Sequence, residues 1–253
     1  LVLLYLLLCI GLYFFQESLV FFPRQLPQNF NFSFETPFEE VCIPVKESDT
    51  LSGLWFKQAS SKGLVFYLHG NAGALDGWGQ ASSTYLKFGY DIFLLDYRGY
   101  GKSTGKISSE AQFYEDVQEA YNWAKNQYSE EKITIIGYSL GTGSAAYLAT
   151  KNSPKQLILQ APYYSLVDMM QQHYSFIPTF LLKYRFETYT FLPQIKAPIT
   201  IFHGNKDATI PLNSSTRLQA FFKPNDQLII LPGAGHNGMN SNPDYLKALA
   251  TVL

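Results

Sequence analysis

Continuous apolar runs of strand length recur along the chain, without the alternation of apolar and polar positions that marks a strand with one solvated face. These runs are GLVFYLHG, DIFLLDYRG, KITIIG, QLILQAP, APITIFHG and DQLIILPG. They predict strands that are buried on both faces, as in a parallel sheet. Two further segments, VCIPVK and LSGLWFKQ, flank ESDT and predict a hairpin whose first strand lies at an edge because it contains Pro44.

Helical patterns occupy the intervals between the runs. The longest, SEAQFYEDVQEAYNWAKNQY, places Phe113, Val117 and Tyr121 on one side of a helix. Alternating strand and helix signals predict an α/β domain over residues 38–253, with a mostly parallel sheet and helices on both faces. Residues 163–193 break the rhythm, since they contain scattered aromatics and short helical patterns but no strand pattern. We expect them to form a small helical cap after strand six.

An uncharged segment, LVLLYLLLCIGLYFF, stands at the start of the sequence. As a helix it would be ~22 Å long at about 1.5 Å per residue, against ~30 Å for the hydrocarbon core of a bilayer. We interpret residues 1–22 as a membrane anchor, truncated if the segment continues upstream, and residues 23–37 as a polar connector. A cleaved signal peptide and a buried core helix are the alternatives, although no small-residue cleavage site follows. Arg24 is the single basic residue among the first 45, too few to predict the membrane side of the domain.

The overall composition excludes some classes of partner. The 253 residues include 19 basic and 20 acidic ones, a formal net charge of -1, with no long run of either sign. Nucleic-acid binding is not expected, because it needs a basic patch or stripe. No paired-cysteine or His-Glu-x-x-His spacing occurs, so neither a metal nor another cofactor is implied. The oligomeric state is not predicted.

The segment ITIIGYSLGTGSAAYLA matches two different turn motifs. From Gly137 it is G-x-S-x-G, a nucleophile elbow that presents Ser139 between a strand and a helix. From Gly141 it fits the dinucleotide fingerprint G-x-G-x-x-[G/A]. The fingerprint needs its first glycine directly after the strand and an acidic residue at the end of the next strand, where this chain has Gln160. The elbow is therefore favoured, and we expect Gly141 and Gly143 to let the helix pack closely on the strand.

A serine hydroxyl needs a base to take its proton, and elbow hydrolases carry their triad in the order Ser, acid, His. Asp207 follows the apolar run TIFHG, and His236 follows the next run. Both positions lie at the carboxyl ends of predicted strands, the edge where open α/β sheets place their sites. The sequence thus predicts Ser139, Asp207 and His236 as the catalytic triad. His203, which precedes glycine at a strand end, is expected to have a structural role.

The oxyanion hole of such a site uses backbone N–H groups. One donor should follow the nucleophile, which makes it Leu140. The other should come from the loop in LHGNAGAL, where we assign Asn71 by position, with Ala72 as the alternative.

Six separated motifs, taken together, resemble the serine hydrolases of the α/β-hydrolase fold. They are YLHGNAG, DYRGYGKSTG, IGYSLG, LQAPYYSL, HGNKDATIP and GAGH, and the resemblance covers the chain from roughly Val41 to the C-terminus. With the apolar N-terminal segment, the chain is similar to the single-pass membrane-anchored branch, which includes eukaryotic protein depalmitoylases and uncharacterised bacterial hydrolases. The resemblance implies an eight-stranded sheet and a Ser-Asp-His triad.

We therefore expect a membrane-anchored serine hydrolase that cleaves a carboxylic ester or thioester, in a small molecule or an acylated substrate, through an acyl-enzyme on Ser139. Aromatic residues in the cap, namely Tyr163, Tyr164, Phe176 and Phe180, favour an acyl chain but would also serve to pack the cap on the domain. A serine peptidase or amidase of the same fold and a non-catalytic scaffold at a membrane are the alternatives.

Overall fold

The computed structural model describes residues 2–253, apart from the side chain of His173, and contains an eight-stranded central sheet. Its strands are β2 (Phe38–Pro44), β3 (Thr50–Phe56), β4 (Leu64–Leu68), β6 (Asp91–Leu95), β7 (Ile133–Tyr138), β8 (Gln156–Gln160), β9 (Ile199–Gly204) and β10 (Gln227–Leu231). Their spatial order is β10-β9-β8-β7-β4-β6-β3-β2. The apolar runs of the sequence thus all form strands, and the central ones are buried along their whole length.

Strand direction follows the sequence patterns. The predicted hairpin is present, because β2 pairs antiparallel with β3 and lies at the edge of the sheet. β3 in turn pairs antiparallel with β6, whereas every pair from β6 to β10 is parallel. The carboxyl ends of β4, β7, β8, β9 and β10 therefore meet at one edge of the sheet, where the loops with polar motifs follow.

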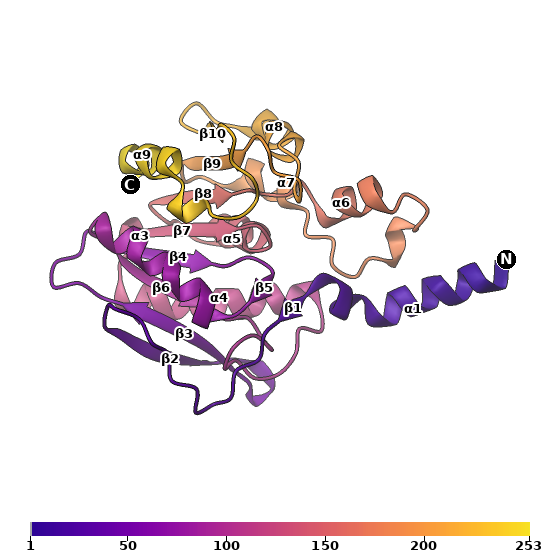
Figure 1. The fold of residues 1–253 in the computed structure, drawn as a ribbon, viewed down its shortest axis with the longest axis horizontal. Coiled ribbons are helices and arrows are strands. Elements are labelled where there is room, and N and C mark those ends of the chain that lie inside the picture. The colour runs from indigo at the N-terminus through magenta and orange to yellow at the C-terminus, as the bar shows by residue number, and fades with distance from the viewer. Residues whose placement is uncertain (1) are drawn as a thin grey trace.

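Helices cover both faces of the sheet (Figure 1). The α-helices of the described residues are α1 (Val2–Val20), α2 (Leu75–Trp78), α3 (Ser82–Lys87), α4 (Glu110–Gln127), α5 (Gly141–Lys151), α6 (Leu166–His173), α7 (Thr188–Phe191), α8 (Asn213–Leu218) and α9 (Pro243–Val252), of which α1 and α6 lie outside the two covering layers. One apolar cluster joins the sheet to Val117 of α4 and Ala145 of α5. A second cluster joins the other face to Tyr85 of α3 and Leu249 of α9. Mostly parallel strands between two helical layers confirm the predicted α/β architecture.

The segment between β8 and β9 contains no strand and carries short helices, as the sequence predicts for the cap. These helices are α6, α7 and two 3-10 helices, Thr179–Leu181 and Leu192–Gln194. Figure 1 places α6 on the side of the molecule from which α1 projects.

The N-terminal helix α1 extends away from the body of the protein (Figure 1). Within residues 2–253, it is the one helix that is long and apolar enough to cross a membrane. The chain that follows it is held on the domain, because β1 (Phe22–Pro23) pairs with β5 (Ala72–Gly73) in a small parallel sheet. Leu26 and Phe32 of this following segment are buried.

Candidate active site

Ser139 lies in a tight turn between β7 and α5. Its φ of 51° is in the left-handed region, which is costly for a residue with a side chain and is typical of a nucleophile elbow. The backbone N–H of Ser139 donates to the carbonyl oxygen of Gln160 at 2.9 Å, which ties the turn to β8. α5 begins at Gly141, two residues after the serine. The hydroxyl is thereby raised above the carboxyl edge of the sheet.

Glycines make this turn possible because the helix lies very close to the strands. A Cβ atom at Gly137 would stand 2.5 Å from the Gly141 carbonyl oxygen, and one at Gly141 would stand 2.2 Å from the carbonyl oxygen of Leu68. The close packing predicted for Gly141 is therefore confirmed. The prediction for Gly143 is wrong in its partner, since a Cβ there would stand 2.1 Å from the hydroxyl of Tyr163 rather than against a strand.

The structure brings Ser139, His236 and Asp207 into one hydrogen-bonded chain. His236 follows β10, and its Nε2 lies 3.1 Å from Ser139 Oγ. The other ring nitrogen, Nδ1, lies 2.7 Å from Oδ2 of Asp207, which follows β9. The Tyr138 hydroxyl donates to the His236 carbonyl oxygen and fixes the histidine loop on the elbow strand. These are the contacts that a nucleophile, a base and an orienting carboxylate need.

Asp207 is surrounded by hydrogen-bond donors. Its Oδ1 accepts from the backbone N–H groups of Thr209 at 2.9 Å and Ile210 at 2.8 Å. Burial on its own would raise the pKa of the carboxyl, but the hydrogen bonds from His203, His236 and Ile210 outweigh it and hold the pKa well below its usual range. Asp207 is therefore ionised at neutral pH and able to stabilise a protonated His236.

His203 is the neighbour that sequence reasoning placed outside the site. Its Nε2 lies 2.8 Å from the carbonyl oxygen of Ile210 and 3.4 Å from Asp207 Oδ2, and its Nδ1 lies 2.6 Å from Ser215 Oγ. The Nε2 group therefore lies between two acceptors, with the carbonyl oxygen of Ile210 the nearer one and Asp207 Oδ2 the farther one. The expected structural role thus includes holding the loop that carries Asp207. The only signal in the sequence was the histidine at the end of β9, four positions before Asp207.

The two residues predicted for the oxyanion hole, Leu140 and Asn71, both line the cavity above Ser139. Among residues 2–253, neither backbone N–H has an acceptor within hydrogen-bond distance. The side chain of Asn71 is held in place, because Nδ2 donates to the Val20 carbonyl oxygen at 2.6 Å and Oδ1 accepts from Phe22 N–H at 3.2 Å and Tyr100 O–H at 3.1 Å. These bonds fix the loop that carries the backbone N–H of Asn71 beside the cavity.

A cavity of about 500 Å³ opens over the triad, and most of its walls are apolar. Leu19 and Val20 from α1 line it, together with Leu166 and Met169 from α6. This contribution of α1 to the cavity was not expected from the sequence, which placed residues 1–22 in a separate anchor. The volume lies in the range of pockets that bury small organic molecules.

The four cap aromatics have different environments. Tyr163 is buried, lines the cavity and donates from its hydroxyl to the Leu140 carbonyl oxygen at 3.2 Å. Tyr164 stacks on Tyr189 at 4.6 Å between ring centroids. Phe176 and Phe180 do not line the cavity and are exposed. The expected role of these two phenylalanines, in acyl binding or in packing the cap, is therefore not met.

No cluster of three or more His, Cys, Asp or Glu side chains suited to a metal ion occurs within the described residues 2–253.

Comparison with known proteins bears on the fold of the chain. Residues 63–187 match a family described as alpha/beta hydrolase fold, a range that includes the elbow but ends before Asp207 and His236. An uncharacterised protein of Mycobacterium tuberculosis is 29% identical over 88% of this chain and 80% of its own length. The lysophosphatidylserine lipase ABHD12 of Mus musculus is 27% identical over 74% of this chain, which spans 55% of that protein.

Solved structures share the architecture. An esterase of Pyrococcus furiosus superposes with a TM-score of 0.72 at 20% identity, covering 91% of this chain and 97% of that one. An α/β-hydrolase of Vibrio vulnificus also gives a TM-score of 0.72, at 21% identity, over 85% of this chain and 81% of that one. The predicted α/β-hydrolase fold is confirmed, and the chain is an α/β-hydrolase enzyme.

Proposed function

We propose that this α/β-hydrolase is a serine hydrolase that cleaves a carboxylic ester or thioester through an acyl-enzyme on Ser139. The observation that carries the proposal is the hydrogen-bonded chain from Ser139 Oγ through both ring nitrogens of His236 to Asp207. Each member follows a different strand, and the serine occupies a left-handed turn. Long-range contacts hold this arrangement in place, among them the bonds from Ser139 N–H to Gln160 and from the Tyr138 hydroxyl to His236.

In the first half-reaction, His236 Nε2 accepts the Ser139 proton as Oγ bonds to the acyl carbon. The carbonyl oxygen gains the electron pair, and the backbone N–H groups of Leu140 and Asn71 stabilise its negative charge. When the carbonyl re-forms, the bond to the leaving oxygen or sulfur breaks, and His236 donates its proton to that atom. Water then releases the acyl group by the same steps in reverse order. Asp207 remains a carboxylate throughout and balances the charge of the imidazolium.

The apolar cavity walls support an acyl chain as the part of the substrate that is bound. Ester cleavage is further supported by the similarity to lysophosphatidylserine lipase ABHD12 and to an esterase. We propose a lipid-like or acylated substrate because the cavity is bounded by Leu19, Leu166 and Met169, with no charged side chain among its lining residues.

We also propose that α1 anchors the protein in a membrane. Its surface is apolar and exposed along most of its length, which is unfavourable in water. A signal sequence would have the same composition. The contacts of Val20 and Phe22 with Asn71 favour a helix that is retained.

The test is labelling of the purified full chain with a fluorophosphonate probe and location of the adduct by mass spectrometry. We expect an adduct on Ser139 that is absent in Ser139→Ala, with unchanged circular dichroism. Among p-nitrophenyl esters from acetate to palmitate, turnover should then be highest for those whose acyl chain fits the apolar cavity. A folded chain that neither reacts with the probe nor cleaves any of these esters would favour a non-catalytic scaffold.

A further inference from the structure

Two hydrogen-bonded connections join the cap to α1. Near the body of the protein, Gln16 Nε2 donates to the Leu181 carbonyl oxygen at 3.1 Å, and Gln16 Oε1 accepts from Lys183 N–H at 2.8 Å. Further along the helix, the Tyr5 hydroxyl donates to the Phe176 carbonyl oxygen at 2.7 Å. The two helix positions are about 16 Å apart along the axis, from a rise of about 1.5 Å per residue. The cap segment therefore runs alongside α1 over about half the thickness of a hydrocarbon core.

The outer surface of this cap segment is apolar. We define it as residues 174–182; Tyr174, Phe176 and Phe180 in it have 54%, 59% and 79% of their surface exposed. The sequence from Met169 to Leu182 contains no Lys, Arg, Asp or Glu. Clustered aromatics of this exposure are uncommon on a surface that faces water, and they mark sites of contact with a membrane or another apolar surface.

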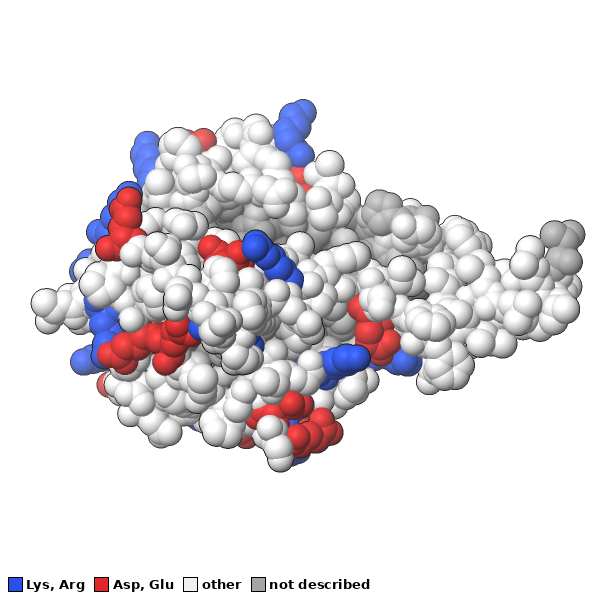
Figure 2. All heavy atoms as spheres, turned by 60° about the horizontal axis from the view of Figure 1, so that its bottom comes forward, with Lys and Arg blue, Asp and Glu red and all other residues white. Residues whose placement is uncertain are grey.

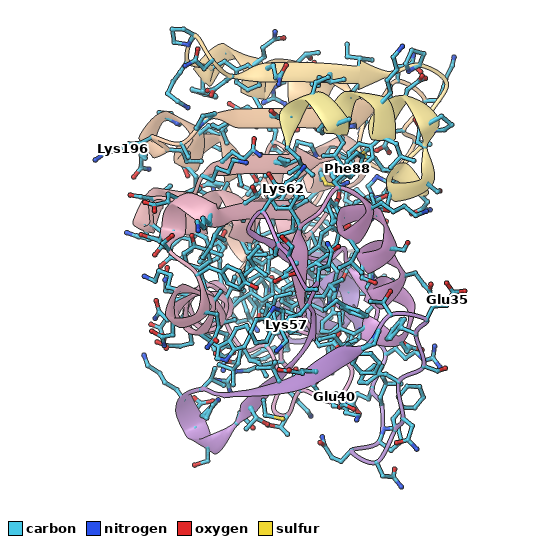
Figure 3. All side chains as sticks on the ribbon, turned by 90° about the vertical axis from the view of Figure 1, so that its left-hand side faces the viewer. Glu35, Glu40, Lys57, Lys62, Phe88 and Lys196 are labelled. Carbon is cyan, nitrogen blue, oxygen red and sulfur yellow. The ribbon has the colours of Figure 1, made fainter. Side chains whose placement is uncertain are left out.

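Charged residues lie at the level where α1 meets the body. Glu17 Oε1 pairs with Lys183 Nζ at 3.1 Å, close to the Gln16 connection. Beyond this level, Figure 2 shows the extension that contains α1 without blue or red side chains, whereas both colours are scattered over the body. The opposite end of the molecule carries charges such as Glu40, Lys57 and Lys196 (Figure 3). This one-sided distribution fits a protein that meets a bilayer at the α1 end.

We propose that residues 174–182 insert into the same bilayer as α1, so that the cap forms a second point of membrane contact. The inference rests on the proposed anchor, because the hydrogen bonds at Tyr5 and Gln16 hold the segment against the helix and carry it to the same depth. This aromatic surface carries no charge and lies next to a spanning helix, so the hydrocarbon core of the bilayer is the partner that it fits. α6, which leads into the segment, supplies Leu166 and Met169 to the cavity. An acylated substrate thus reaches Ser139 from the lipid side.

The experiment places tryptophan on the segment in the full chain. Phe176→Trp and Phe180→Trp are reconstituted into dioleoylphosphatidylcholine vesicles that contain lipid brominated in mid-chain. Ile230→Trp, on β10 and 44% exposed, is the matched control. Emission is compared with the parent chain, which has three tryptophans. We expect bromolipid to quench the added emission at positions 176 and 180 and not at 230. Co-flotation with the vesicles is measured on the same samples.

Flotation separates failure of the cap from failure of the anchor. Chains that float without quenching at 176 and 180 overturn the cap proposal and leave the anchor intact. Chains that do not float overturn both. A third outcome would assign the surface to a second copy of the chain instead. In that case the tryptophan variants show no quenching by bromolipid and sediment as dimers, and the double variant F176S/F180S sediments as a monomer.

Activity gives an independent readout with the double variant F176S/F180S. Because neither phenylalanine lines the cavity, turnover of p-nitrophenyl acetate in solution should not change. Turnover of p-nitrophenyl palmitate embedded in the same vesicles should fall about tenfold or more, since two large apolar side chains no longer hold the cap in the lipid. Equal loss on both esters would show a folding defect, and equal retention would contradict the proposal.

Discussion

At the residue scale, Asp207 shows how environment assigns a role. Hydrogen bonds from His203, His236 and Ile210 keep this carboxylate ionised. Its Oδ2 is directed at His236 Nδ1. The sequence predicted the residue from chain order, Ser then Asp then His, and from its place after an apolar run. It could not predict the donors around it, because Thr209 and Ile210 act through backbone N–H groups that any residue possesses.

Asp207→Asn should lower kcat about 10⁴-fold with the fold intact. An amide at this position favours the wrong tautomer of His236 and cannot balance the imidazolium charge. Turnover of p-nitrophenyl acetate measures the fall in kcat, and circular dichroism shows whether the fold is intact. Near-normal turnover would move the acid role to another carboxylate, for which Asp168 is the next candidate. Asp168 is paired with Arg217 at 2.6 Å, so that Asp168→Asn serves as the control and should leave kcat nearly unchanged.

The low pKa of Asp207 also predicts a pH dependence of stability. The folded-state pKa lies below the unfolded value of about 3.9, so the carboxylate stabilises the fold above about pH 4. This contribution is lost as the pH falls through the folded pKa. We therefore expect the difference in urea midpoint between the wild type and Asp207→Asn to be larger at pH 7 than at pH 3. A difference that grows on acidification would show that the carboxyl is protonated more easily in the folded state.

Asn71 should be a positioning residue as well as a backbone donor. Asn71→Ala removes three hydrogen bonds to Val20, Phe22 and Tyr100 and frees the loop that presents the N–H group. We expect kcat to fall roughly 10²-fold, the scale of losing one oxyanion donor, with little change in KM. Tyr100→Phe removes one of the three bonds and should have a smaller effect. A pure rise in KM would indicate that the loop binds substrate instead.

At the element scale, β7 and α5 can pack closely because Gly137 and Gly141, at their junction, have no side chains. Strand runs, their parallel arrangement and the elbow followed from apolar pattern and motif, which are local properties. The pairing of β1 with β5 was not predicted, because Phe22–Pro23 and Ala72–Gly73 are short and carry no alternating pattern. The contact of Gly143 with Tyr163 is also long-range, and a glycine in the sequence does not show which atom approaches it.

Gly141→Ala should destabilise this junction by about 1–3 kcal/mol, the range for overpacking a close contact. The added Cβ would stand 2.2 Å from the Leu68 carbonyl oxygen and 2.8 Å from that of His69, both of them backbone atoms. Because these residues lead into the Asn71 loop, kcat should fall as well. Gly77→Ala in α2 is the matched control, since a Cβ there has nothing within 4 Å. Urea unfolding of both variants measures the difference, and equal midpoints would contradict this account.

At the scale of the whole molecule, α1 has two parts with different roles. Residues up to about Phe15 are mainly exposed and apolar, whereas Gln16 is buried and bonded to the cap. Beyond it, Val20 binds Asn71, and Phe21, Leu26 and Phe32 are buried. The sequence alone suggested an anchor at 1–22 and a connector at 23–37, because the apolar run hides the change from lipid-facing to core-facing residues.

Two truncations should separate these roles. A chain beginning at Gln16 loses the bond from Tyr5 to Phe176 but keeps the Gln16 contacts to the cap and the contacts to Asn71. It should therefore cleave p-nitrophenyl acetate normally but no longer float with phosphatidylcholine vesicles. A chain beginning at Phe34 also loses the burial of Phe21, Leu26 and Phe32, worth about 1.5–3 kcal/mol each. That loss is a large fraction of a typical stability of about 5–15 kcal/mol. The chain that begins at Phe34 should therefore neither float with the vesicles nor cleave the soluble ester, and its urea midpoint should be lower. Full acetate turnover by the Phe34 chain would show that the N-terminal segment is an anchor and nothing more, and the contact between Val20 and Asn71 would then have no part in catalysis.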